Sequence, residues 1–252
     1  MTALLIDIGN TRIKWARLAG RRLGRARAAA HADWGMREFI RLFRDGQRFD
    51  RIIVASVAGP ELNRALSQSA AHTGGPAPEF VSTMRRACGV TVAYLEPWRL
   101  GVDRFMAMIA AHDRFARHAT CVVGVGTAMT IDLLGADGRH WGGAIIPAPT
   151  LMVESLLKGT NGIRRRAHGG ARGKGPALFA RSTRAALEQG ARFAAAAAVD
   201  RAVAEARAVI GRTPRVILTG GGAQNLQPLI QAESILAPDL VLQGLAVWAR
   251  EG

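Results

Sequence analysis

The chain has 252 residues, of which 49% are hydrophobic, so it is long enough to bury one large core or two smaller ones. No apolar run approaches the roughly 18 residues of a membrane-spanning helix. The first residues lack the basic, apolar and small-residue order of a signal peptide, and we therefore expect a cytoplasmic protein. The two cysteines, Cys88 and Cys121, lack CxxC spacing and predict neither a disulfide framework nor a zinc site.

The formal net charge of +15 raises the question of nucleic-acid binding, because neutralisation of phosphates dominates such binding. The excess is almost entirely arginine, scattered along an alanine-rich chain. This pattern is more typical of a coding bias than of a nucleic-acid surface, so we expect no nucleic-acid partner. One basic stretch, residues 163–174, is dense, and its glycines predict a solvated, mobile loop. The alternative is a surface that attracts anionic ligands.

Residues 4–18 predict a β-hairpin, because an apolar run enters a tight polar turn and alternating apolar residues leave it. The turn at residues 7–11 brings together a carboxylate, a glycine and a threonine, and a lysine follows closely. Such a cluster can hold a phosphate and its Mg²⁺, with Thr11 donating, Lys14 supplying charge and Asp7 facing the metal. The alternative is an ordinary hairpin turn whose aspartate makes a local hydrogen bond.

Strand and helix patterns alternate in the chain that follows, which predicts a parallel or mixed sheet with helices on its faces. The apolar run at 52–57 is typical of a buried parallel strand, and Pro60 stands where the start of a helix tolerates proline. The expected elements are strands at 22–30, 52–57 and 79–82, a helix at 33–43 with Asp33 near its cap, and a helix at 60–72.

A buried helix is predicted through residues 106–112, and Asp103 and Arg104 fall in its first turn. An aspartate at this position ordinarily caps a helix or interacts with its dipole. That account leaves Arg104 unexplained, since a cation is disfavoured at this end of a helix. A carboxylate beside an arginine could instead activate a hydroxyl while the arginine holds an anionic substrate.

Residues 122–134 repeat the layout of the first hairpin, with Gly126-Thr127 standing where Gly9-Asn10 stand. Matching hairpins about half a chain apart suggest an internal duplication, with one phosphate loop in each half and a nucleotide in a cleft between them. We therefore expect an N-terminal half, 1–117, and a C-terminal half, 118–252.

The rest of the second half is read from the same patterns. Gly220-Gly221-Gly222 follow a buried strand and either let the backbone approach an adenosine or make a plain glycine turn. The other expected elements are strands at 141–146, 215–219 and 239–243, helices at 149–157 and 244–250, and one or two alanine-rich helices within 179–209, with Gly190 as a candidate interruption.

Six short motifs occur in one order along nearly the whole chain, and together they resemble the type III pantothenate kinases and their Bvg-accessory-factor relatives. The motifs are Asp7-x-Gly9-Asn10-Thr11, Gly101-x-Asp103-Arg104, Gly126-Thr127-Ala128-x-Thr130, Gly142-Gly143-Ala144-Ile145-Ile146-Pro147, Ser182-Thr183 and Thr219-Gly220-Gly221-Gly222-Ala223. The resemblance implies an α/β fold of the duplicated ribonuclease H-like type found in actin, hexokinase and Hsp70. Two mixed sheets with flanking helices would hold ATP in the cleft between them.

The resemblance also implies a reaction, transfer of the γ-phosphate of ATP to pantothenate with Mg²⁺, in a homodimer that has Thr183 near its subunit boundary. It assigns proton acceptance to Asp103. The residues implied for ATP are Asp7, Ile8, Gly9, Asn10, Thr11, Arg12, Ile13, Lys14 and Thr127. Those implied for pantothenate are Tyr94, Gly101, Val102, Asp103, Arg104 and Thr183.

One position departs from the family pattern. The second loop of the family usually begins with an aspartate that helps to bind a monovalent cation, K⁺ or NH₄⁺, and here the residue is Gly124. Glycine has no carboxylate, so either cation dependence is lost or another group, such as Asp132 or the arginine-rich surroundings, replaces it. A sugar kinase of the same fold, or a catalytically weak regulatory protein, remains an alternative function.

Overall fold

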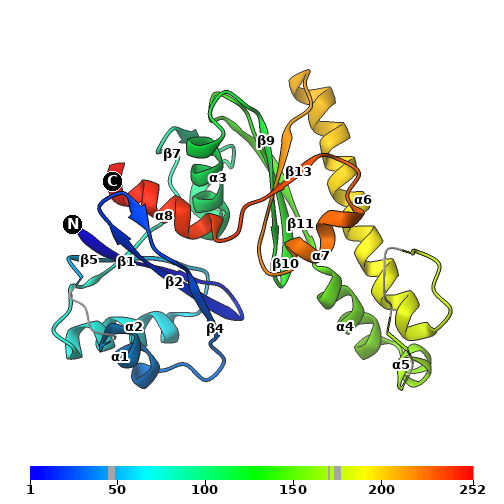
Figure 1. Ribbon diagram of the computed structural model, residues 1–252, viewed down its shortest axis with the longest axis horizontal. Helices are drawn as coiled ribbons and strands as arrows, with labels where there is room; N and C mark the ends of the chain where they lie inside the picture. The colour runs from blue at the N-terminus through cyan, green and yellow to red at the C-terminus, as the bar shows by residue number, and fades with distance from the viewer. Residues whose placement is uncertain (45–48, 170, 173–176, 252) are drawn as a thin grey trace. The chain divides into compact units, whose positions relative to one another are not determined.

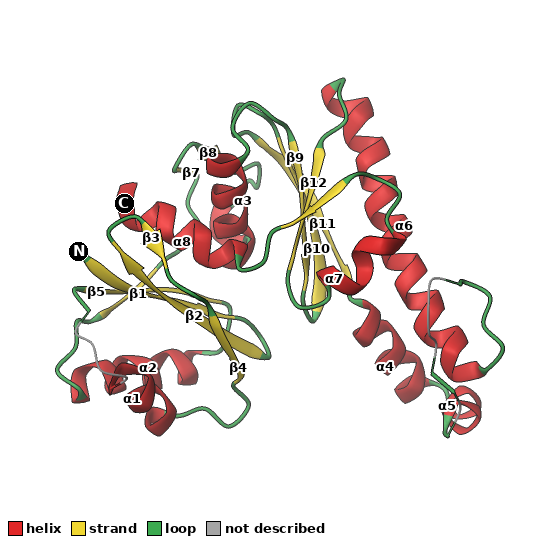
Figure 2. Ribbon diagram, viewed as in Figure 1, coloured by secondary structure: helices red, strands yellow, loops and turns green. Residues whose placement is uncertain are grey.

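The computed structural model describes residues 1–44, 49–169, 171–172 and 177–251, and contacts divide the chain into two compact units. The first unit comprises Met1–Ala116, Asp137–His140 and Asp239–Gly252, and the second comprises Arg117–Ala136 and Trp141–Pro238. Figure 1 follows the elements along the chain, and Figure 2 separates helices from strands. Among the described residues, no helix combines the length and the apolar character needed to cross a membrane.

The first unit is built on a mixed sheet whose strands follow the order β3-β2-β1-β5-β6, with β4 also paired to β2. The predicted hairpin is confirmed as β1 (Thr2–Ile8) and β2 (Arg12–Ala19), which run antiparallel. The predicted buried strand is confirmed as β5 (Arg51–Ser56), which runs parallel to β1. The remaining strands are β3 (Arg22–Leu23), β4 (Arg27–Ala30) and β6 (Pro78–Phe80), so the single strand expected at 22–30 is two short strands.

Helices cover both faces of this sheet, which is why β1 and β5 are apolar on both sides. On one face, α1 (Met36–Arg44) and α2 (Pro60–His72) enclose a core that includes Phe39 and Leu66. On the other face lie α3 (Val102–Arg114) and α8 (Leu240–Glu251), which pack on each other and on the sheet.

The C-terminal helix α8 belongs to the first unit because its backbone meets that of α3. A Cβ on Gly244 would overlap the Met106 backbone, so only glycine permits this helix contact. The strand predicted at 239–243 is therefore wrong: α8 begins at Leu240 and continues through the helix expected at 244–250. The two units are defined by contacts within the folded chain, whereas the predicted boundary after residue 117 divides the sequence into duplicated halves. That boundary therefore stays a prediction.

The second unit repeats the topology of the first, with strands in the order β11-β10-β9-β12-β13. In each sheet an antiparallel hairpin lies beside its third strand on one side and two parallel strands on the other. The strands are β9 (Thr120–Val125), β10 (Ala128–Leu134), β11 (His140–Pro147), β12 (Arg215–Thr219) and β13 (Ser234–Leu236). This shared order confirms the predicted duplicated α/β fold.

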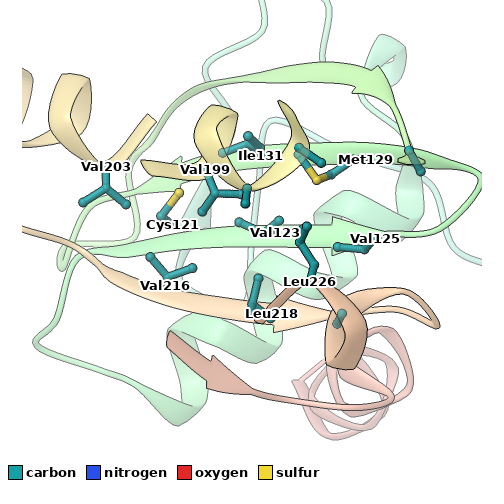
Figure 3. Packing of buried hydrophobic residues seen from close by; sticks show 14 residues of the cluster. Cys121, Val123, Val125, Met129, Ile131, Val199, Val203, Val216, Leu218 and Leu226 are labelled. Carbon is teal, nitrogen blue, oxygen red and sulfur yellow. The ribbon is translucent and has the colours of Figure 1, made fainter. Parts of the chain in front are cut away.

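One face of this second sheet carries the core drawn in Figure 3. Alternate residues of β9, among them Cys121, Val123 and Val125, pack against Val199 and Val203 of α6 (Thr183–Ile210). Helix α4 (Pro149–Gly159) packs on α6, and α5 (Asn161–Ala167) follows it. The shorter elements of the chain are β7 (Arg86–Ala87), β8 (Val90–Thr91), η1 (Pro97–Arg99), α7 (Ala223–Leu226) and η2 (Gln227–Leu229).

Three local predictions need correction. Helix α1 begins at Met36, and the side chain of Glu38 accepts the Gly35 N–H at 2.9 Å, so Asp33 is not the cap. Helix α6 is continuous through Gly190, because its packing outweighs the roughly 1 kcal/mol cost of an interior glycine. The basic stretch expected to be a loop is helical as far as Ala167; residues 170 and 173–176 lie outside the described residues.

Candidate active site

Hydrogen bonds to both the N–H and the carbonyl of Gly9 hold the β1–β2 turn in place. The Gly9 N–H donates to the Arg12 carbonyl at 3.0 Å, and a Cβ on Gly9 would lie 3.3 Å from the same oxygen. His31 Nε2 lies 2.7 Å from the Gly9 carbonyl oxygen, and since a carbonyl only accepts, this nitrogen carries the proton. The side chains of Asn10 and Thr11 are exposed, so the polar side of the turn is open to a ligand.

Asp7 and Lys14 lie opposite each other across the hairpin. Burial, then the nearby carboxylate of Asp103, raises the pKa of Asp7 to about 7, with Lys14 lowering it and Asp239 raising it further. Lys14 Nζ lies 2.9 Å from Oδ1 of Asp239, which precedes α8 with a positive φ of 60°. These four side chains therefore form one charged cluster within the first unit.

The start of α3 explains why the glycine and the aspartate occur together. Gly101 is the N-cap residue, and a Cβ on it would lie only 2.5 Å from Oδ1 of Asp103. That same oxygen accepts the Arg104 N–H at 2.8 Å. The carboxylate thus folds back over a position that only glycine leaves empty, and the expectation that Asp103 caps the helix is wrong. An interaction of Asp103 with the helix dipole fits its place in the first turn.

Arg104 is almost fully buried, with 6% of its surface exposed, and its guanidinium meets an aromatic pair. Its Nη1 donates to the Tyr94 hydroxyl at 3.1 Å, and its Cζ lies 5.7 Å from the centroid of the Tyr94 ring. The buried His140 stacks on Tyr94, with ring centroids 6.0 Å apart and ring planes 21° from parallel. Val102, two residues before Arg104, is also buried. The arrangement presents a positive charge with limited freedom to move.

Thr127 and Thr183 lie in the second unit. Thr127 is exposed in the β9–β10 turn, where the Gly126 N–H donates to the Ala128 carbonyl at 3.0 Å. Thr183 begins α6 directly after Ser182, whose hydroxyl accepts the Ala185 N–H at 3.2 Å and caps the helix. The contacts of the two threonines with substrates stay predictions.

Gly124 lies on β9 opposite Thr130, and a Cβ on it would be 2.9 Å from the Thr130 hydroxyl oxygen. Asp132, two residues along β10, is buried on the same face. The residues present therefore do not fit the family's monovalent-cation site, since no carboxylate occupies position 124 and the threonine hydroxyl fills part of its space.

The glycines after β12 have a structural reason of their own. Gly220 has a φ of 93°, and a Cβ on it would overlap the Val125 backbone. The Gly222 N–H donates to the Val125 carbonyl at 3.1 Å. These glycines bring the loop against the end of β9, as the plain-turn alternative requires; a contact with adenosine stays a prediction.

Three residues near the site were not found from the sequence: Asp239, His31 and His140. Each acts through a partner that is distant along the chain, such as Lys14 for Asp239, and no local spacing signals such a pair. Isolated histidines and a C-terminal aspartate have no motif of their own.

Comparison with known proteins adds the family. The family model for "Type III pantothenate kinase" matches residues 3–205. A type III pantothenate kinase of Nitrosococcus oceani is 34% identical over 253 residues, covering 98% of this chain and 94% of that protein. One of Stenotrophomonas maltophilia is 39% identical over 259 residues, covering 99% and 98%.

Solved structures share the fold at low sequence identity. The activator of 2-hydroxyisocaproyl-CoA dehydratase from Clostridium difficile, with bound ADPNP, has a TM-score of 0.52 at 14% identity and covers 99% of this chain and 94% of its own. A glucokinase from an Antarctic psychrotroph has a TM-score of 0.50 at 11% identity and covers 99% and 98%. These likenesses confirm the fold class. The nearly full-length relatives and the matched family model show that the chain belongs to the type III pantothenate kinase family.

Proposed function

We propose that this protein transfers the γ-phosphate of ATP to pantothenate, giving 4'-phosphopantothenate and ADP, the first step of coenzyme A biosynthesis. Family membership supports the reaction. The structural observation that carries the proposal is the cluster in the first unit, where the carboxylate of Asp7 interacts electrostatically with Lys14 across the hairpin and with Asp103 of α3. Phosphoryl transfer asks a protein mainly for positioning and neutralisation of charge, and this cluster supplies both.

The hairpin is assigned to ATP and its Mg²⁺. Asp7 fits a divalent cation, because its pKa of about 7 leaves the carboxylate poorly ionised at neutral pH until a positive charge stabilises it. Mg²⁺ in kinase sites takes one or two carboxylates together with substrate phosphates, and it neutralises the phosphate charge. Lys14 would donate to phosphate oxygens while its ion pair with Asp239 fixes where the ammonium lies.

The start of α3 is assigned to pantothenate. Arg104, oriented by Tyr94, would bind the carboxylate of pantothenate, and Gly101 and Val102 would shape the surrounding surface. The hydroxyl oxygen of pantothenate would form a bond to the γ-phosphorus while the bond between that phosphorus and the ADP oxygen breaks. Asp103 would accept the proton that the hydroxyl loses. Such a proton acceptor typically contributes about 10²- to 10⁴-fold to the rate.

The second unit is given a smaller part in the proposal. Thr127 would contact ATP, and Thr183 would contact pantothenate in a homodimer. No step is assigned to a monovalent cation, since Gly124 offers no carboxylate to hold one.

An ADP-release assay with pantothenate and MgATP tests the function, and Asp103→Asn tests the mechanism. We expect the substitution to lower kcat by at least about 100-fold with little change in ATP affinity. The matched control is Asp113→Asn in the last turn of the same helix, where the carboxylate lies 3.4 Å from Arg250 and should not affect turnover.

Two results would contradict the proposal in different ways. Turnover of a sugar in place of pantothenate would assign the site to another acceptor. Unchanged turnover in Asp103→Asn, with ADP still released on addition of pantothenate, would keep the reaction and remove Asp103 from it.

A further inference from the structure

Five described residues of the dense basic stretch line a cavity that the proposed kinase reaction does not use: Arg164, Ala167, His168, Gly169 and Arg172. The cavity has a volume of about 570 Å³ and lies within the second unit. Its basic side chains come from four segments: Lys158 from α4, Arg164 from α5, His168 and Arg172 from the segment after α5, and Arg184 from α6. Neighbouring segments of the second unit thus bring positive charge to one place.

The charge in this cavity is poorly balanced. Among the described residues, the lining contains no aspartate or glutamate. On α6, Arg184 forms an ion pair with Glu188 at 2.7 Å. Two like charges 4 Å apart repel by about 1 kcal/mol even in water. Cations gathered around one hollow repel one another, and an anion bound there would relieve that repulsion.

Local hydrogen bonds hold the cavity walls. The Ser182 hydroxyl donates to the Ala171 carbonyl at 2.9 Å, which ties the segment beside Arg172 to the start of α6. At the corner between α4 and α5, the Thr160 hydroxyl donates to the Leu156 carbonyl at 2.6 Å, and the Arg164 N–H donates to the Thr160 carbonyl at 3.0 Å. These hydrogen bonds therefore hold the backbone at the α4–α5 corner and beside the start of α6.

We propose that this cavity binds a di- or triphosphate group. The volume lies within the range of small-molecule sites, about 300–1,000 Å³. Arginine forks match phosphate oxygens in a bidentate way, and several of them together favour a polyvalent anion over a single carboxylate. Leu157 and Ala167 provide an apolar side to the cavity. The proposal stands on the second unit alone and does not depend on the kinase reaction.

The test is isothermal titration calorimetry at low salt, in which inorganic pyrophosphate is added to the full-length protein and its affinity is measured. The double variant Arg164→Gln/Arg172→Gln should lose at least about tenfold in affinity, which is about 1.4 kcal/mol. The matched control is Arg165→Gln/Arg181→Gln, which removes the same charge from neighbouring positions outside the lining and should change affinity by less than about twofold. Thermal melts check folding, and the single variant Arg164→Gln replaces the double if the double melts early.

Parallel titrations identify the source of the phosphate. Equal losses for tripolyphosphate and ATP in the cavity variant mean that the phosphates alone are recognised, whereas a larger loss for ATP assigns the site to a nucleotide. Equal losses of pyrophosphate affinity in both double variants would overturn the proposal in favour of general charge attraction. A parallel loss of affinity for duplex DNA would then identify the surface as a nucleic-acid surface. Absence of pyrophosphate binding at millimolar concentration would also overturn it.

Discussion

The hairpins β1–β2 and β9–β10 occupy the same place in their two sheets, and each has a parallel strand, β5 or β12, beside its first strand. Their turns differ in length by one residue, since the Gly9 N–H donates to the Arg12 carbonyl and the Gly126 N–H donates to the Ala128 carbonyl, each at 3.0 Å. The two halves therefore share a strand order, and their hairpins differ in the length of the turn and in their side chains.

The side chains differ at the register position two residues before each turn glycine. In the first hairpin this position pairs Asp7 with Lys14, whereas in the second it pairs Gly124 with Thr130. One hairpin therefore carries a charged pair where the other carries a glycine and a hydroxyl. In the proposed reaction the charged groups that hold the phosphates would therefore come from the first hairpin, and the second hairpin would supply only uncharged groups.

The largest effect that tests this contrast is expected for Lys14→Gln. Loss of the charge-assisted hydrogen bonds to phosphate should lower kcat/KM for ATP by roughly 10- to 100-fold and leave KM for pantothenate nearly unchanged. Steady-state kinetics with each substrate varied in turn measures the two values. The control is Arg37→Gln on α1, which removes one exposed positive charge from the same unit.

The ion pair between Lys14 and Asp239 allows the effect of the lysine charge to be compared with the effect of its partner. Asp239→Asn keeps an acceptor near Lys14 but removes the charge, so we expect a loss of only a few-fold, within the typical range of a partly exposed ion pair. A loss as large as that of Lys14→Gln would assign Asp239 a direct contact with a substrate. No loss in either variant would place the phosphates elsewhere.

Asp7 should lower the stability of the free protein at neutral and alkaline pH. Its pKa rises from 3.8 to about 7 on folding, so the folded state binds the proton more tightly. The stability that this group contributes is fully present below pH 3.8 and is lost as the pH rises through 7. Asp7→Asn should therefore increase the free energy of unfolding by on the order of 4 kcal/mol more at pH 8 than at pH 4.

Denaturant unfolding without Mg²⁺ measures this difference, with the exposed Asp33→Asn as the control that should show no such pH dependence. An equal change in stability at both pH values would mean that the carboxylate ionises freely in the folded protein. In the Asp7→Asn variant, the part of the pH-dependent loss of stability that comes from this carboxylate should be absent.

The sequence predicted those parts of the molecule that depend on neighbours along the chain. Helix α2 begins at Pro60 and ends at His72 as expected, because proline marks a helix start and apolar spacing sets its length. Both hairpins follow from alternation around a glycine turn. The Gly101-x-Asp103 spacing is likewise local, since one residue makes room for the carboxylate of the other.

The parts that were missed depend on tertiary contacts. The segment at 239–243 has a short apolar pattern that fits a strand or a helix, and its contact with α3 at Gly244 decides for the helix. Asp239 reaches Lys14 across 225 positions of the chain, so only the folded structure reveals the pair. Gly190 is tolerated in α6 for the same reason, because packing against the second sheet outweighs propensity.

The smallest effect is expected for monovalent cations, where the second hairpin departs from its family. With glycine at position 124 and the Thr130 hydroxyl in the space beside it, turnover in K⁺ or NH₄⁺ should differ from turnover in choline by less than about twofold, or about 0.4 kcal/mol. Gly124→Asp should introduce a dependence on K⁺, because it restores a carboxylate, although Thr130 must rotate to admit it. Strong K⁺ stimulation of the unaltered protein that Asp132→Asn abolishes would instead show that the buried carboxylate two residues along β10 had taken over the task.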